Sequence, residues 1–242
     1  MYPKLLFQLF LLSKPKHSKK LKDTELPKIT TIEEKETYKS KEGKELLKAS
    51  YIYPKISYNE SVTFENTVNN FFKEKQEGYK KEEKDALISA ENLYEEFPDT
   101  SLLPYSINTN YNTTLNIENN LSFKLYYDSY LGGAHGIALV KGGTFNPKYN
   151  RAMIYYDFFI KDKEKVDKTL NYLIEKNIEE QGLTEYLFPY EKGKLPLPEG
   201  DSFYLLPKGM VFIYNVYEIA PYSAGTIFVT LGYNELCEIW EG

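Results

Sequence analysis

The chain has 242 residues, of which 30 are basic and 35 acidic, so its formal charge is −5. Because Cys237 is the one cysteine, an internal disulfide and a paired-cysteine zinc or redox site are excluded. Arg151 is the one arginine, so the chain has few guanidinium groups with which to contact phosphates or base edges, and nucleic-acid binding is not expected. The 23 tyrosines and 14 phenylalanines favour a folded chain that contains β-structure. This length suits one large domain or two small ones with a core of their own.

The N-terminal 47 residues are expected to be a tail. Residues 5 to 12 are apolar apart from Gln8, which is too short for a membrane span, and neither a small-residue cleavage site nor a lipid-accepting cysteine follows. They fit two interpretations equally: a weak export signal, or a short terminus that packs on the domain. Residues 14 to 50 are rich in lysine and glutamate, which predicts a solvated linker. Part of this linker could add a strand to the edge of a sheet. Contact with a membrane surface is expected only through this N-terminal part.

Residues 48 to 100 are expected to form a small module of helix and sheet. A β-prone run around Tyr51 carries Pro54, which suits an edge strand or a strand that ends in a bulge. A helix is predicted from a cap at Thr63 through Phe72, and a second from about residue 82 to 96, with Gly78 as the joint between them.

Residues 101 to 242 are expected to form a mixed or antiparallel sheet domain with one main packed helix. The helix is predicted from Lys163 to about Glu180, with Gly182 as its stop. Strands are predicted at residues 105–110, 113–117, 121–130, 137–140, 152–156, 203–206, 210–217 and 226–231. Strands broken by helices without regular alternation indicate the α+β class.

A glycine-rich segment, residues 131–136 (LGGAHG), follows the strand that ends at Tyr130. His135 is the only histidine in the predicted folded part, so a histidine-rich metal site is excluded, and no metal or other cofactor is expected. His135 could act as a general base with Asp128 or Asp157. The alternative is that the glycines, Gly132, Gly133 and Gly136, meet a backbone requirement while the imidazole bonds to a neighbouring strand.

A second motif, YEIAPYSAG, ends at Gly225. It places Tyr217, Pro221 and Tyr222 at a turn between two apolar strands. If the tyrosines and the proline are exposed at this turn, they offer rigid contact area for binding a partner. If Tyr217 and Tyr222 are instead half-buried with hydrogen-bonded hydroxyls, their role is to fill the edge of the core. The ligand-binding candidates are therefore Tyr217, Pro221, Tyr222, His135 and Tyr130.

These motifs together resemble a known family. The segments YYDSYLGGAHGIAL and DSFYLLPKGMVFIYNVYEIAPYSAG, with Asp157-Phe158-Phe159 between them, are similar to the domain shared by RsiV-type anti-sigma factors and PdaC-type peptidoglycan deacetylases. The resemblance covers about residues 48 to 240. It marks Gly132, Gly133, Gly136, Asp157 and Gly225 as motif positions and implies an accessory, extracytoplasmic domain without a catalytic centre of its own.

The leading hypothesis is a non-catalytic extracytoplasmic binding module. The resemblance implies a protein partner of the lysozyme type or a cell-wall fragment as ligand. Two alternatives remain open: a hydrolase acting on cell-wall material with His135 as general base, and an architectural interaction module.

Overall fold

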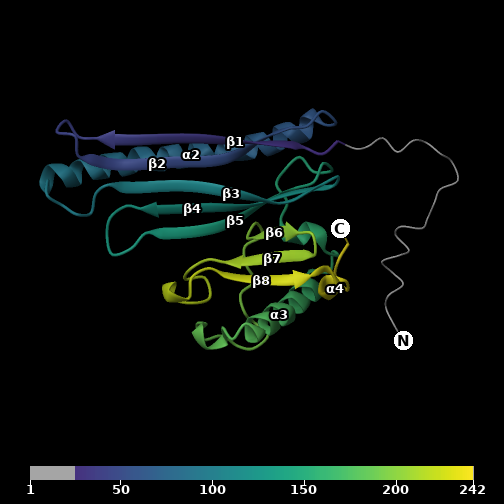
Figure 1. Ribbon diagram of the computed structural model, residues 1–242. Helices are drawn as coiled ribbons and strands as arrows, with labels where there is room; N and C mark the ends of the chain where they lie inside the picture. The colour runs from purple at the N-terminus through teal and green to yellow at the C-terminus, as the bar shows by residue number, and fades with distance from the viewer. Residues whose placement is uncertain (1–24, 242) are drawn as a thin grey trace.

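The computed structural model describes residues 25–241, so the expectations for the first 24 residues lie outside the described part (Figure 1). Within that part the α-helices and strands run in the order β1 (Lys28–Lys39), β2 (Glu45–Ser57), α2 (Val62–Glu96), β3 (Tyr105–Ile117), β4 (Asn120–Tyr130), β5 (Ile137–Phe145), α3 (Lys163–Glu180), β6 (Phe203–Leu206), β7 (Gly209–Tyr214), β8 (Ile227–Gly232) and α4 (Tyr233–Leu236). They form two sheets, which confirms the α+β class. None of the described helices combines the length and apolar character that crossing a membrane requires.

The larger sheet has five strands in the order β1-β2-β3-β4-β5. Neighbouring strands are antiparallel except β2 and β3, which are parallel and joined through α2. β1 occupies residues 28–39 of the segment expected as a charged linker, and its exposed, charged sequence suits a sheet edge. The sheet also runs across the boundary expected at residue 100, because β3, β4 and β5 extend the sheet that β2 begins.

The helix α2 corrects the prediction of two helices joined at Gly78. It is one helix of 35 residues, capped by the Ser61 side chain, which accepts a hydrogen bond from the Phe64 amide at 3.2 Å, rather than by Thr63. A glycine inside a helix costs only about 1 kcal/mol, which packing of the flanking turns offsets. Buried side chains on both sides of Gly78, including Val68, Phe72, Ala86 and Ala90, hold the helix on the sheet.

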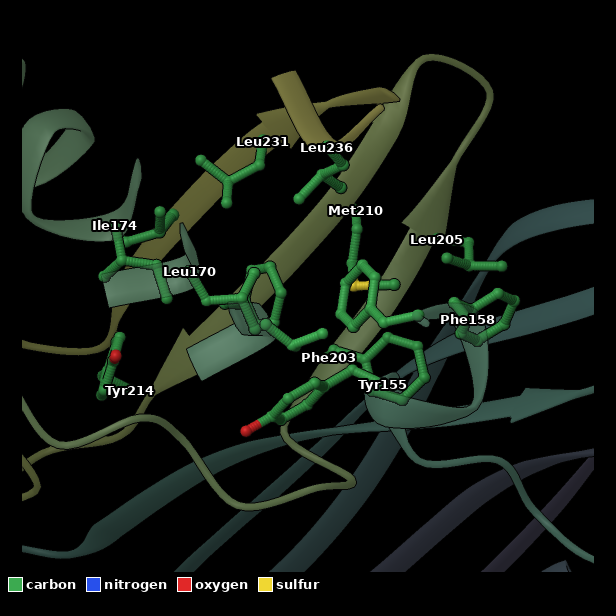
Figure 2. Packing of buried hydrophobic residues seen from close by; sticks show 14 of the residues in the cluster. Tyr155, Phe158, Leu170, Ile174, Phe203, Leu205, Met210, Tyr214, Leu231 and Leu236 are labelled. Atoms are coloured by element: carbon green, nitrogen blue, oxygen red, sulfur yellow. The ribbon is translucent and has the colours of Figure 1, made fainter. Parts of the chain in front are cut away.

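The smaller sheet, β6-β7-β8, packs with α3 around the largest core of the molecule. Figure 2 shows this cluster, in which Leu170 and Ile174 of α3 face the strand residues Met210 and Leu231. The strand predicted at residues 152–156 is wrong: Tyr155–Phe158 form a 3₁₀ turn. The Met153 amide donates to the Thr144 carbonyl of β5, but the Tyr155 amide donates to the Gly200 carbonyl in a loop, so the segment does not continue alongside one strand.

The two sheets touch where β6 crosses β5 and β4. The Gly142 amide donates to the Asp201 carbonyl at 3.1 Å, and the Leu205 amide donates to the Ser122 hydroxyl at 2.9 Å. A Cβ on Gly142 would lie 1.5 Å from the Phe203 carbonyl oxygen, so only glycine permits this approach. A further apolar cluster joins β5 to the smaller sheet through Val140, Tyr204, Val211 and Ile213.

Candidate functional site

The two sequence motifs meet at one end of the molecule. The β4–β5 loop, residues 131–136, carries the GGAHG motif, and the β7–β8 loop, residues 215–226, carries YEIAPYSAG. Figure 1 shows both loops at the left end, away from the C-terminus. The Tyr222 hydroxyl donates a hydrogen bond to the Gly136 carbonyl at 3.2 Å, which ties the loops together across 86 residues of sequence.

Three rings form a cluster at this junction, which we call the aromatic cluster: His135, Tyr222 and Tyr217. The His135 and Tyr222 rings are stacked with centroids 4.2 Å apart, and the Tyr222 and Tyr217 rings are tilted at 5.8 Å. His135 Nδ1 lies 2.9 Å from the Gly136 carbonyl oxygen. Because a carbonyl only accepts, Nδ1 carries the proton in this contact, and Nε2 of the neutral ring is the nitrogen that accepts a hydrogen bond.

Tyr217 has an unusual backbone. Its φ is +68°, and among the described residues it is the one non-glycine residue with a positive φ. This conformation is rare for a bulky side chain and costs on the order of 1–3 kcal/mol. The turn is closed by a hydrogen bond from the Tyr217 amide to the Ala220 carbonyl at 3.0 Å, and the side chain is 58% exposed. Pro221 follows directly and is partly buried.

Asn215, which no sequence motif singles out, holds the second loop in place. Its buried side chain accepts from the Val140 amide at 2.7 Å and donates to the Val140 carbonyl at 3.0 Å. The Asn215 side chain thus makes the hydrogen bonds that a neighbouring strand would make with the outer edge of β5. β7 ends at Tyr214, three residues before the predicted end of this strand at Tyr217. No local pattern marks such a residue, because its partner lies 75 positions away.

The motif glycines meet backbone requirements. Gly132 and Gly133 have φ of +85° and +94°, and a Cβ on Gly136 would lie 2.5 Å from the Ser129 carbonyl oxygen. Gly225, with φ +68°, ends the second loop. Tyr130 lies on the inner side of the first loop: its hydroxyl donates to the Gly133 carbonyl at 3.3 Å, and its ring is edge-on to Tyr105. Tyr130 is thus tied to the first loop and has no ring contact with the aromatic cluster.

The carboxylates considered as partners of His135 have other neighbours in the described structure. Asp157 forms a two-pronged ion pair with Arg151, at 2.6 and 2.7 Å, and accepts the Ile154 amide. Burial raises the Asp157 pKa, but these hydrogen bonds outweigh it and hold the pKa below its usual value. Asp128 lies 3.5 Å from the Asn108 amide nitrogen. Within residues 25–241, no three His, Cys, Asp or Glu side chains gather as a metal site would need.

Apolar side chains surround the first loop. Leu131, the first residue of the loop, and Ile137, which follows the loop, are 40% and 53% exposed. Both line a cavity of about 380 Å³ between α2 and strands β4 and β5, with Tyr79, Leu139 and Lys141 among its other residues. Leu131 and Ile137 thus form an exposed apolar surface on the α2 side of the first loop.

Two family models match separate parts of the chain. A family model described as deacetylase PdaC matches residues 40–138, and a model described as a protein of unknown function, DUF3298, matches residues 156–234. No curated protein matches the sequence significantly.

Two solved structures share the fold. The crystal structure of a DUF3298 family member from Bacteroides fragilis has a TM-score of 0.72 at 19% identity and covers 91% of this chain and 96% of its own. A DUF3298 family protein from Pseudomonas aeruginosa has a TM-score of 0.60 at 12% identity, with 90% of this chain and 96% of its own covered. Residues 40–138 thus match a PdaC-type model and residues 156–234 a DUF3298 model, and the whole chain shares the fold of DUF3298 family structures.

Proposed function

We propose that the chain is an extracytoplasmic binding module that recognises a folded protein through the aromatic cluster, with a lysozyme-like hydrolase as the first partner to test. The observation that carries this is Tyr217, a bulky side chain kept exposed by a costly backbone conformation. A fold retains such a residue where function depends on its position. The adjoining rings of Tyr222 and His135 extend the contact area, and tyrosine is enriched among the few residues that dominate the binding energy of protein interfaces.

Calorimetric titration with purified lysozyme tests the proposal. Tyr217→Gly removes the ring but accepts the positive φ, so the variant should fold at least as well as the parent while its Kd rises by about 30-fold, the loss expected for a central aromatic contact. The control is Tyr172→Ala, which removes a side chain that is 66% exposed on α3. An unchanged Kd for Tyr217→Gly, or no binding by the parent at millimolar lysozyme, would overturn the proposal.

The extracytoplasmic location rests on the resemblance to domains of this kind. Fractionation of cells that produce the full chain would test it, with the protein expected in the envelope or secreted fraction. Recovery of all the protein with a cytosolic marker would contradict it.

A further inference from the structure

The five-stranded sheet has a polar face that the aromatic cluster does not use. Side chains alternate along a strand, and Leu47, Ala49, Tyr51, Tyr105 and Ile107 point into the core under α2. Their neighbours in sequence therefore point to the opposite side. There the smaller sheet covers the part near Ser122, Gly142 and Val140, where Tyr126 also packs against it. In Figure 1, α2 lies behind the sheet along β1 and β2.

The open part of this face carries polar groups in a regular grid. The register places Ser50, Asn108, Asp128 and Ala138 in one row across β2, β3, β4 and β5. The next row pairs Asn110 with Tyr126, and Asn112 follows on β3. Rows along a strand are about 7 Å apart and neighbouring strands about 4.8 Å apart. We call these six residues, Ser50, Asn108, Asn110, Asn112, Tyr126 and Asp128, the polar grid.

The grid lines a concave surface with a volume of about 510 Å³. That volume falls within the range of about 300–1,000 Å³ typical of small-molecule sites. Ile52, Ala138 and Val140 supply apolar contact between the polar groups. The surface thus combines shape, apolar contact and several hydrogen-bonding groups that converge on one volume.

Asn110 and Asn112 keep hydrogen-bonding capacity for a ligand, whereas the Asn108 side chain donates to Asp128. The Tyr126 hydroxyl donates to Asn112 Oδ1 at 2.8 Å, and Asn110 Oδ1 accepts the Tyr111 amide at 2.8 Å. Their Nδ2 groups have no hydrogen-bond acceptor among the described residues. Asparagine is also a poor strand former, and three of them at alternate positions of β3 lower strand propensity without filling a core.

The charges that line this surface indicate which class of ligand it can bind. Asp128 is the one charged residue that lines this surface. The nearby Lys124 is turned to aromatic rings, with its Nζ 4.0 Å from the Phe228 ring centre and 4.9 Å from that of Tyr126. A surface with one carboxylate, several amides and no free cation disfavours phosphates and other anions, and it offers paired donors and acceptors to neighbouring hydroxyl groups.

We propose that the polar grid binds a neutral oligosaccharide, with the amide groups of Asn110 and Asn112 and the carboxylate of Asp128 hydrogen-bonded to sugar hydroxyls. This site is separate from the aromatic cluster, and its test does not depend on protein recognition there. Binding is expected to be independent of salt, because no ion pair with the ligand is involved.

The test is titration of isotope-labelled protein with chitotetraose, cellotetraose and maltotetraose, followed by NMR, with tetragalacturonate as the anionic comparison. At least one neutral tetrasaccharide should shift resonances of β3 and β4, and the anionic one should not. The double variant Asn110→Thr/Asn112→Thr replaces amides by a better strand former, so it should fold at least as stably while the Kd rises by about tenfold or more.

The matched control is Asn70→Ala, which removes an exposed amide from α2. No shifts with any neutral sugar at 10 mM ligand (about the weakest binding worth assigning) would overturn the proposal. Binding of tetragalacturonate alone, or affinity unchanged in the double variant, would overturn it as well.

Discussion

The helices α2 and α3 both pack on their sheets through apolar side chains, but α2 also buries a charged one. Glu83 of α2 is only 3% exposed and accepts hydrogen bonds from the hydroxyls of Tyr38 and Tyr51, the latter at 2.5 Å, with Lys80 Nζ at 3.4 Å. By contrast, α3 buries only aliphatic side chains: Val166, Leu170, Ile174 and Ile178. The hydrogen bonds of a buried charged group depend on its protonation state, whereas apolar contacts do not. A change of pH should therefore alter the stability of the α2 region more than that of the α3 region.

The junction between the two regions gives the largest expected effect. Gly142→Ala places a methyl group against the Phe203 carbonyl oxygen of β6, a backbone atom that cannot move without displacing the smaller sheet. The free energy of unfolding should fall by more than about 3 kcal/mol, and the two regions should unfold in separate steps. Urea unfolding followed by circular dichroism and tyrosine fluorescence measures both.

Gly143→Ala is the matched control for that variant, because the nearest atoms to its Cβ would be side-chain atoms of Leu125 and Phe71 at 3.4 Å and of Phe145 at 3.7 Å, and none of them is a backbone atom. Equal losses in the two variants would show that the close approach of β6 to Gly142 is not what joins the regions.

Removing apolar contact under α3 is next in size. Leu170→Ala leaves a cavity in the core shown in Figure 2 and should lower the free energy of unfolding by about 2–5 kcal/mol, by the same amount at pH 5 and pH 8. Tyr172→Ala on the exposed side of α3 should change it little. A loss for Leu170→Ala that depends on pH would contradict the contrast between the helices.

Under α2 the corresponding change is Glu83→Gln, which keeps the size of the side chain but removes its charge. The free energy of unfolding should fall by about 1.5–3 kcal/mol, the range for hydrogen bonds to a charged acceptor. Burial raises the Glu83 pKa, but the hydrogen bonds from Tyr38 and Tyr51 and the charge of Lys80 outweigh it and hold the pKa below its usual value.

The sign of the acid effect follows from that lowered pKa. The stabilisation is complete above the unfolded pKa of Glu83 and is lost as the pH falls through the folded pKa. In Glu83→Gln, the free energy of unfolding, measured with urea, should therefore fall less steeply at acid pH than it does in the parent. The exposed Glu91→Gln on the same helix should leave that fall as steep as in the parent.

At high pH the same region should weaken. The hydrogen bond to Glu83, together with burial, raises the pKa of Tyr38 to about 12, and burial with the hydrogen bond to Glu34 raises that of Tyr53 to about 12. Their contribution is complete below the unfolded value of 10.0 and falls between that value and about 12, because the unfolded chain gives up protons that the folded chain keeps.

Tyr38→Phe should reduce this alkaline loss of stability, measured by urea unfolding from pH 8 to pH 11.5. The reduction should be modest, because the residue is partly exposed and water screens its interactions. Tyr172→Phe is the control. An alkaline limb identical in Tyr38→Phe and the parent would contradict the role given to the hydroxyl.

The smallest expected effect has the opposite sign. Gly78 lies in the exposed middle of α2, where an added methyl group would meet nothing within 4 Å, so Gly78→Ala should raise the free energy of unfolding by about 0.5–1 kcal/mol. Gly182→Ala, at φ +70°, should lower it. A loss of stability in Gly78→Ala would favour a joint at that position over one continuous helix.

The two helices also show what the sequence can predict. The apolar spacing of α3 marks its face from Val166 to Ile178, and the predicted span Lys163 to Glu180 is confirmed. The prediction divides α2 at Gly78 because a glycine between two short apolar stripes looks like a break, while the sheet contacts that carry the helix through it lie far away in sequence. The parallel pairing of β2 with β3 could not be predicted either, because 47 residues separate Ser57 at the end of β2 from Tyr105 at the start of β3.

The candidate site is predicted in part. The motifs mark both loops and name His135, Tyr222 and Tyr217, whose rings the structure brings into contact. Asn215 escapes sequence reasoning because its partner Val140 lies on another strand. The polar grid does leave a signal, the alternation of asparagines at 108, 110 and 112, which gains meaning only when β4 and β5 are placed beside it.

Hydrogen exchange of the chain with and without saturating lysozyme tests the central claim, that the aromatic cluster is the protein-binding surface, most directly. We expect slower exchange in residues 131–137 and 215–226, with exchange on the exposed face of α3 around Tyr172 unchanged. Slower exchange confined to α2, α3 or the outer strand β1, with both loops unaffected, would contradict it.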